Sequence, residues 1–538
     1  MIKNKYLLVF IFFIGSLIAS SVDVSGRAEY FYMTRLENSQ LVNIPFRLLD
    51  LNVQHQVNDK FNIFGNVGVE YRNRRDTDFM TDSNLEDFLL DIRELYISMY
   101  LGNGEIRIGK QIHSWGSVDE NSPIDNLNAY DYYYLLLGGA EKKLGAYSLA
   151  YDNYINFLGN AKFSFVYSPM HNTSRLPVND PDYPIGVPEE SSPTPNATIL
   201  SDITPDEYGL NLKWSFDFGD ISLSHLSMYD RMFNLSGLTI YTDEFFMGNS
   251  VDAVPRYSYR YTNVINLGAV FLANDFTLAF DYSNFNSEDQ NDLDSFNDLV
   301  NPFYDLGDPL GAPSLWTEQN RSFQEKVKYS QFALQFEMPF ENNFKVNTQY
   351  FKHSISDYSS NDLNLSCDEL VEALDNFSAE DCENIEDGLG ISLDNFKTKN
   401  LFIPGVGTPY AMITSEAVLL NFEKGFPDND LIVDFNAFID MDSYTSKLYD
   451  LGDCIIFDED SGEPICDENS IDEDYEKKYQ STKGKGMLLS LEFEHDLGDG
   501  FELSYGLTKI FGNDDIENYN FNSMESFSSF RSAISYYF

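Results

Sequence analysis

Polar and charged residues alternate with apolar residues along many segments of this 538-residue chain. Successive side chains of a β-strand point to opposite faces, so each such segment predicts a strand with one apolar and one polar face. Polar faces that enclose water can sort solutes by charge. We predict that eight residues on these faces line a pore: Glu70, Arg72, Glu94, Arg107, Gln111, His113, Lys213 and Arg260.

A base and a nucleophile two positions apart, His225 and Ser227, suggest hydrolytic chemistry. Outer-membrane phospholipases place a His and a Ser in this way, and the triplet resembles theirs faintly. A catalytic pair normally needs a third group to orient the base, and the sequence identifies none. The same face also contains Ile221 and Leu223, which predicts contact with lipid. We therefore expect no catalytic residues, and a barrel-embedded lipid hydrolase remains an alternative.

The four cysteines form two local pairs within acidic segments, and we predict disulfides Cys367–Cys382 and Cys454–Cys466. Neither spacing is typical of a metal site. Residues 458–463 resemble a calcium loop in composition but lack its order of ligands. We expect no metal and no cofactor.

The formal net charge of −51 excludes nucleic acid as a partner, because phosphate binding needs a basic surface. Much of the acid is concentrated in residues 287–324, 357–407 and 442–482. Aromatic residues make up 15% of the chain. No apolar run after residue 21 is long enough for a membrane-spanning helix, whereas a membrane barrel would place aromatic rings at both membrane interfaces.

Short turns and long polar connections alternate along the whole chain, as in a transmembrane β-barrel. Short turns are predicted near 58–60, 101–104, 157–160, 218–220, 274–275, 340–342, 424–429 and 497–500. Long connections are predicted near 37–42, 74–87, 114–144, 169–206, 231–256, 287–325, 357–407, 442–482 and 512–523. These 17 connections predict an all-β, antiparallel barrel of about 18 strands, with short periplasmic turns and long acidic extracellular loops.

The two ends of the chain predict export and membrane assembly. Residues 1–21 have two lysines, a short apolar run and small residues, as in a signal peptide. Residues 22–538 then form a single barrel. The last segment alternates apolar and aromatic residues and ends in phenylalanine, which resembles the signal that the barrel-assembly machinery recognises. Its residues are Phe530, Ile534, Tyr536 and Phe538.

One stretch, residues 92–152, resembles a known family. It contains Arg93-Glu94-Leu95-Tyr96, Gly109-Lys110-Gln111 followed by Trp115-Gly116, Asn128-Ala129-Tyr130-Asp131, and Lys142-Lys143-Leu144. These motifs resemble porin-like outer-membrane β-barrel proteins of unknown function and, more distantly, alginate-export porins. Lys110, Ala129 and Gly145 depart from the family pattern. The resemblance implies passive passage of small molecules.

The same stretch predicts local structure. Gly109 would allow a bend or a close backbone approach, and Trp115 would lie at the outer membrane interface. The connection 114–144 could fold into the lumen and narrow it.

The sequence thus predicts an outer-membrane porin for small solutes with a weak preference for cations. A surface-binding or adhesion barrel is a further alternative. Expected partners are outer-membrane lipid, lipopolysaccharide and the barrel-assembly machinery, and a homotrimer is left open.

Overall fold

The computed structural model describes most of the barrel wall and part of the connections. The described residues are 22–72, 88–135, 142–155, 160–177, 183, 206–243, 251–273, 275–290, 316–360, 399, 402–448, 456–457, 464–465, 478–514, 516 and 519–538. The predicted signal peptide and all four cysteines lie outside these residues, so the cleavage site and the two disulfides stay predictions.

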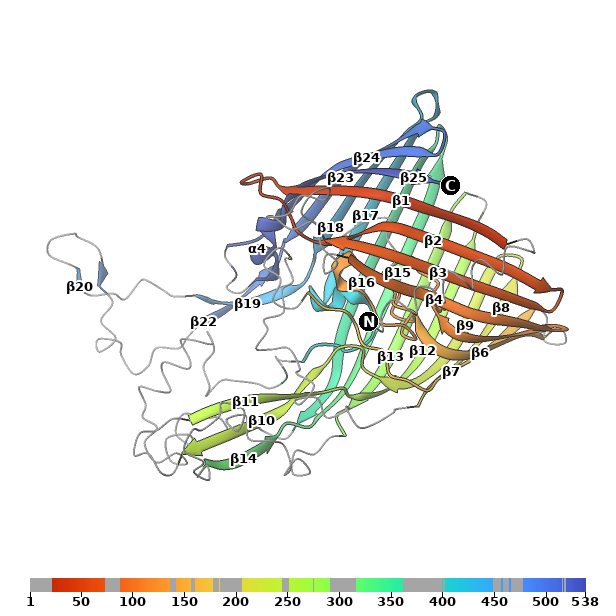
Figure 1. The fold of residues 1–538 in the computed structure, drawn as a ribbon. Helices are drawn as coiled ribbons and strands as arrows, with labels where there is room; N and C mark the ends of the chain where they lie inside the picture. Colours follow the sequence, from red (N-terminus) through yellow and green to blue (C-terminus); the bar gives the residue numbers. More distant parts are fainter. Residues whose placement is uncertain are drawn as a thin grey trace, which may run out of the picture.

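Eighteen antiparallel strands form one closed barrel, and each strand pairs with its neighbours in chain order (Figure 1). β25 pairs with β1, from Arg27 opposite Tyr537 to Arg35 opposite Ser529, and this seam closes the sheet. The strands are β1 Val22–Arg35, β2 Pro45–Asn58, β3 Phe61–Arg72, β4 Phe88–Leu101, β5 Gly104–Gln111, β6 Ala146–Ile155, β7 Ala161–Ser168, β8 Glu207–Phe216, β9 Gly219–Tyr229, β12 Tyr261–Leu272, β13 Thr277–Glu288, β15 Glu325–Phe340, β16 Phe344–Ser360, β17 Glu416–Phe426, β18 Leu431–Asp440, β23 Met487–Gly498, β24 Phe501–Phe511 and β25 Ser529–Tyr537.

The predicted strand count and the alternation of short and long connections are confirmed. Eight short turns gather at one end of the barrel, and the nine long connections leave from the other (Figure 1). The tightest turns use residues in the left-handed region, such as Gly102 with φ of 63° and Asn342 with φ of 64°. Glycine and asparagine tolerate this backbone best.

Three long connections contain strands that periodicity did not reveal. β10 (Asn234–Asp243), β11 (Val251–Ser258) and β14 (Trp316–Ser322) form a separate sheet from connections predicted as loops at 231–256 and 287–325. This sheet projects from the end opposite the short turns (Figure 1). In the connection 442–482, β19 (Ser443–Leu448) pairs with β22 (Lys478–Lys483), and β20 (Ile456–Phe457) pairs with β21 (Pro464–Ile465).

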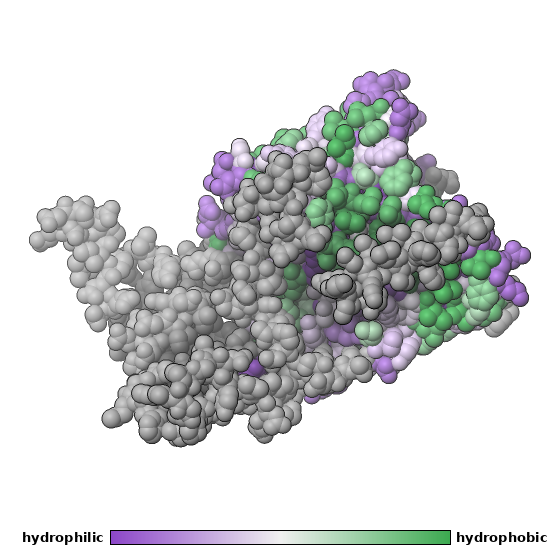
Figure 2. All heavy atoms as spheres, viewed as in Figure 1, coloured by the Kyte–Doolittle hydropathy of each residue, from purple (hydrophilic) through white to green (hydrophobic). Residues whose placement is uncertain are grey.

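The barrel is apolar outside and polar inside, the reverse of a soluble protein. On β8, Tyr208 and Phe216 are 41% and 48% exposed on the outer face, whereas Asn211 is buried on the inner face. Figure 2 shows apolar side chains gathered on the visible wall and hydrophilic ones toward the tips. Such a wall fits contact with lipid around a polar lumen. None of the helices in the described residues is long and apolar enough to cross a membrane.

Exposed aromatic rings form a belt beside the short turns. Phe218, in the turn between β8 and β9, stacks between Phe216 of β8 and Phe271 of β12, with centroids 5.3 and 6.5 Å away. Phe501 and Tyr536 make a similar contact at 4.7 Å next to the seam. Aromatic belts are typical of a membrane–water interface.

The outer half of the lumen is filled by connections that fold inward. Short helical turns η2 (Tyr132–Tyr134), η10 (Pro409–Met412), α4 (Asn520–Met524) and η14 (Glu525–Phe527) pack with inner-face residues of the wall. Among those wall residues are Phe351 of β16, Phe438 of β18 and Ile510 of β24. The candidate site lies between these inward connections and the short turns.

Candidate functional site: the channel lumen

The connection between β5 and β6 crosses the lumen to the opposite wall. The backbone amides of Ser117 and Val118 donate to one carboxylate oxygen of Asp281 on β13, at 2.8 and 3.0 Å. The hydroxyl of Ser122 donates to the same oxygen at 2.6 Å. β13 lies six strands around the barrel from β5. The loop is therefore a bridge across the channel, in agreement with the inward course considered for residues 114–144.

Two further wall strands hold the tip of this loop. Asp119 exchanges hydrogen bonds with Gln335 of β15: its amide donates at 2.7 Å and its carboxylate accepts at 2.6 Å. Gln349 of β16 donates from Nε2 to the carbonyl oxygen of Asp119 at 3.1 Å. The tip thus has a fixed place against β13, β15 and β16.

The other arm of the loop is tied to β3 through a buried charge cluster. Arg175 contacts Glu70 at 2.7 Å and Asp131 at 3.1 Å, and the hydroxyl of Tyr134 donates to Glu70 at 3.0 Å. The guanidinium of Arg47 stacks on the ring of Tyr134 at 4.6 Å. Burial raises the pKa of Asp131 to about 6, against the lowering effect of Arg175.

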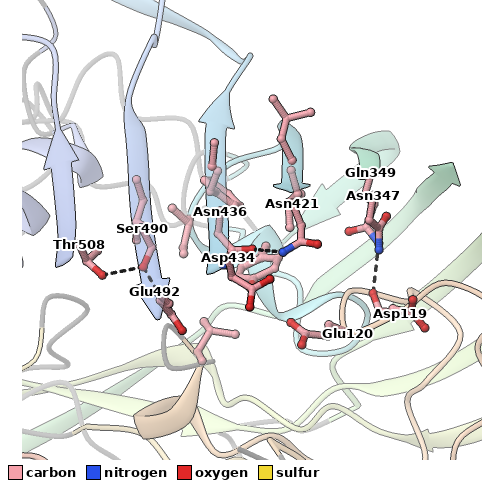
Figure 3. A pocket seen from close by; sticks show the side chains of 18 of the residues that line it. Asp119, Glu120, Asn347, Gln349, Asn421, Asp434, Asn436, Ser490, Glu492 and Thr508 are labelled. Carbon is pink, nitrogen blue, oxygen red and sulfur yellow. Dashed lines mark hydrogen bonds between the residues drawn. The ribbon is translucent and has the colours of Figure 1, made fainter. Parts of the chain in front are cut away.

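A cavity of about 630 Å³ lies between this loop and the wall made by β15 to β24 (Figure 3). Five acidic side chains and one lysine line it: Asp119, Glu120, Asp434, Glu492, Glu494 and Lys142. The lysine contacts Glu120 at 2.9 Å. Between the acids and the apolar loop helices lie amides and hydroxyls, including Asn421, which donates to Asn436 at 2.8 Å.

A second cavity of about 590 Å³ lies toward the short turns and shares Glu494 with the first. Five acidic side chains and one lysine line this cavity too: Glu423, Asp430, Glu494, Asp496, Glu502 and Lys345. The lysine contacts Glu337 at 3.3 Å. The two cavities together form an acidic path along the inside of the barrel.

The strand register places acidic side chains directly beside one another on this path. Glu423 of β17 is opposite Asp434 of β18, and Asp434 is opposite Glu492 of β23. Asp496 of β23 is opposite Glu502 of β24. Like charges at directly opposed positions destabilise a sheet. The row ends at Arg531 of β25, which forms an ion pair with Glu492.

Four basic residues of the facing wall each have an acidic partner. Arg93 contacts Asp50 at 3.3 Å, Arg107 contacts Asp152 at 3.0 Å, and Lys213 contacts Asp220 at 2.8 Å. Lys162 also contacts Asp152, at 3.2 Å. The charges of these four residues are therefore offset locally on the facing wall.

The structure separates the eight predicted pore-lining residues into two groups. Arg72, Glu94, Arg107 and Lys213 are partly exposed on the inner wall. Glu70, Gln111, His113 and Arg260 are buried beneath folded connections, with 4%, 0%, 5% and 1% exposure. Inward loops cover these four side chains in the structure, and the lining of an open pore by the eight residues stays a prediction.

Arg260 shows the reason most clearly. It lies between β11 and β12, where it contacts Asp230 at 2.8 Å and Glu325 at 2.9 Å and stacks on Phe402 at 4.6 Å. His113 contacts the hydroxyl of Ser148 at 3.0 Å, and burial lowers the pKa of His113 to about 3. Both side chains hold loops to the wall.

Two predictions for residues 92–152 concern Gly109 and Trp115: the first is confirmed and the second is wrong. Gly109 has φ of 141°, and an added Cβ would lie 2.2 Å from the carbonyl oxygen of Leu95. The predicted close backbone approach is confirmed. Trp115, predicted at the membrane interface, instead packs inside the barrel against Gly209, because the loop that contains it turns inward.

The His225 and Ser227 pair lies on the outer side of β9, beside Leu223, which is 50% exposed. The hydroxyl of Ser227 is hydrogen-bonded to that of Tyr261. The ring of His225 packs near the ring of Tyr208, 6.2 Å between centroids. His225 thus contacts β8 and Ser227 contacts β12, and these contacts do not join the two side chains to each other. The arrangement gives the hydrolase alternative no support.

Sequence reasoning missed the residues that hold the loop tip. Asp119 lies more than 200 positions from Gln335 and from Gln349, and none of the three belongs to a motif. The period-two pattern of β15 and of β16 places Gln335 and Gln349 on the inner face, but no sequence signal indicates which loop reaches them.

Comparison with solved structures finds outer-membrane channel proteins. One is Pseudomonas aeruginosa OccK2 (OpdF) in complex with glucuronate, at 11% identity and a TM-score of 0.45, covering 96% of this chain and 98% of that one. Another is Acinetobacter baumannii OccAB3, at 10% sequence identity and a TM-score of 0.44, covering 96% of this chain and 98% of that one. A BenF-like porin from Pseudomonas fluorescens Pf-5 has 10% identity, a TM-score of 0.43 and coverage of 96% and 98%.

No protein-family model matches the chain, and no curated protein does either. The resemblance of residues 92–152 to alginate-export porins therefore stays a prediction.

Proposed function

We propose that this protein is an outer-membrane porin through which small solutes diffuse passively, with a preference for cations. The observation that supports this most is the pair of cavities inside the closed barrel, which share Glu494 and lie between the loop bridge and the short turns. A polar lumen inside an apolar wall is the arrangement of a water-filled channel.

The sign of the preference follows from the charges. Nine acidic residues and two lysines line the two cavities, and both lysines already contact a glutamate. Potassium should therefore accumulate in the lumen at low salt, within about 8–10 Å of the charges, and the effect should fade as salt screens them. Assembly by the barrel machinery, contact with lipopolysaccharide and a trimeric state are further expectations.

Planar-bilayer recording of the purified full chain tests the proposal. We expect stepwise conductance in potassium chloride and a reversal potential, under a tenfold gradient, with the sign of cation selectivity. A matched pair of variants locates the cause. Asp434→Asn should reduce the selectivity, whereas Glu105→Gln, on the facing wall and outside both cavities, should leave it nearly unchanged. A membrane-inserted barrel without conductance would contradict the proposal.

A further inference from the structure

We infer that the acidic path binds and passes elongated organic dications, the class of α,ω-diamines, in preference to monoamines and to dicarboxylates. This inference rests on the proposed porin function and adds the chemical class of solute that the same lumen favours.

The first argument is the retained repulsion between neighbouring carboxylates. Glu423, Asp434 and Glu492 are consecutive partners across three strands, and Arg531 contacts only the last of them. Lys345 of β16 is opposite Glu423 but forms its ion pair with Glu337, and no ion pair joins Glu423 or Asp434 to a base among the described residues. Directly opposed like charges lower the stability of a sheet, so a bound cation would relieve this row.

The second argument is the spacing of the acids along the channel. Glu492, Glu494 and Asp496 are alternate residues of β23 and point into the lumen. Alternate residues of a strand are roughly 6.6–6.8 Å apart. A short diamine has two ammonium groups at a comparable separation, so it can contact two steps of this ladder at once. A monoamine can occupy only one step at a time.

The third argument is a buried hydrogen-bond acceptor in the first cavity. Gln349 is 6% exposed and lines this cavity (Figure 3). Its Nε2 donates to the carbonyl oxygen of Asp119, which fixes the amide orientation and leaves Oε1 as the acceptor. That oxygen has no hydrogen-bond partner within the part of the chain that the structure describes. An ammonium group has three donors and no acceptor, so it would satisfy this oxygen.

The fourth argument is the apolar side of the same cavity. Leu135, Tyr410, Ile413, Phe521 and Met524 from three inward connections line it opposite the carboxylates. A methylene chain could pack against this surface while its charged ends contact the acids. A hydrated metal ion would leave the apolar surface in water, which favours an organic cation.

The test compares three solutes of similar length on the full chain in a planar bilayer: 1,5-diaminopentane, pentylamine and glutarate. We expect micromolar to millimolar diamine to interrupt the potassium current, with pentylamine much weaker and glutarate without effect. In the variant Asp434→Asn/Glu494→Gln, the apparent affinity for diamine should fall roughly fivefold or more, because two attractive charges are lost. Glu105→Gln is the matched control.

The outcomes separate the two claims. Absence of any potassium conductance would overturn the porin function itself. Normal conductance with equal block by diamine and pentylamine would overturn the dication inference alone. Equal loss of diamine block in Glu105→Gln would also overturn it, because the general charge of the lumen, and not the ladder, would then account for binding.

Discussion

The hydroxyl of Ser122 donates a 2.6 Å hydrogen bond to the carboxylate of Asp281, although 159 positions separate the two residues in the chain. Two loop amides donate to the same oxygen. This carboxylate therefore joins the loop bridge to a wall strand on the other side of the lumen.

We predict that Asp281→Ala loosens the loop bridge and widens the channel. Hydrogen bonds to an ionised group contribute about 1.5–3 kcal/mol each, and this substitution removes three. Single-channel recording should show larger mean conductance and more open-channel noise. Ser283→Ala is the control, since it removes a single bond, from its hydroxyl to the carbonyl of Pro123. Conductance of Asp281→Ala identical to that of the original chain would show that the bridge holds without this carboxylate.

The number of strands and their faces could be predicted from sequence because both depend on local patterns. Turn residues recur at short range, and the side chains of a strand alternate with period two. The Ser122–Asp281 contact could not be predicted, because any loop hydroxyl can pair with any inner carboxylate. The burial of Arg260 could not be predicted for a related reason: a charged residue at a strand end faces water only if no loop folds over it.

We predict that acidic pH stabilises the docking of residues 129–135 of the loop bridge inside the lumen. The pKa of Asp131 is raised to about 6 where the loop is docked, from the ordinary value of 3.8 expected on release. The docked state thus binds a proton more tightly. Docking should weaken as pH rises from about 3.8 to 6 and change little above that.

Hydrogen–deuterium exchange of residues 129–135, corrected for the intrinsic pH dependence of exchange, measures this effect. Protection should be greater at pH 5 than at pH 7. Arg175, Glu70 and Arg47 are the charged groups that surround Asp131. Asp131→Asn keeps the shape of the side chain but cannot titrate, so it should remove the pH dependence. Persistence of the dependence in that variant would assign it to another group.

We predict that Arg531→Gln increases the preference for cations. Arg531 neutralises Glu492 at the end of the acidic row, so its removal adds one uncompensated carboxylate to the first cavity. The reversal potential in dilute potassium chloride should move further toward the potassium potential, with less change at high salt. Lys326→Gln is a suitable control because its partner Glu288 is 44% exposed and outside both cavities. A shift toward chloride would mean that Glu492 does not influence the permeating ions.

We predict that the double substitution Tyr536→Ser and Phe538→Ser impairs closure and assembly of the barrel. Ile534, Tyr536 and Phe538 are 46%, 39% and 48% exposed on the outer face, as the alternation predicted. Backbone hydrogen bonds between Gly26 and Phe538, at 3.0 and 3.1 Å, end the seam between β25 and β1.

The two serines would put hydroxyls where the aromatic belt meets lipid, and they would remove the ring contact between Tyr536 and Phe501. Less heat-modifiable barrel should appear in the outer-membrane fraction. Tyr537→Phe is the matched control, because that ring is on the other face and the substitution keeps the ring while it removes the hydrogen bonds of the hydroxyl with Glu502, at 3.4 Å, and with Arg27. Full assembly of the double variant would contradict a role for these rings, and an equal defect in Tyr537→Phe would assign the effect to the strand as a whole.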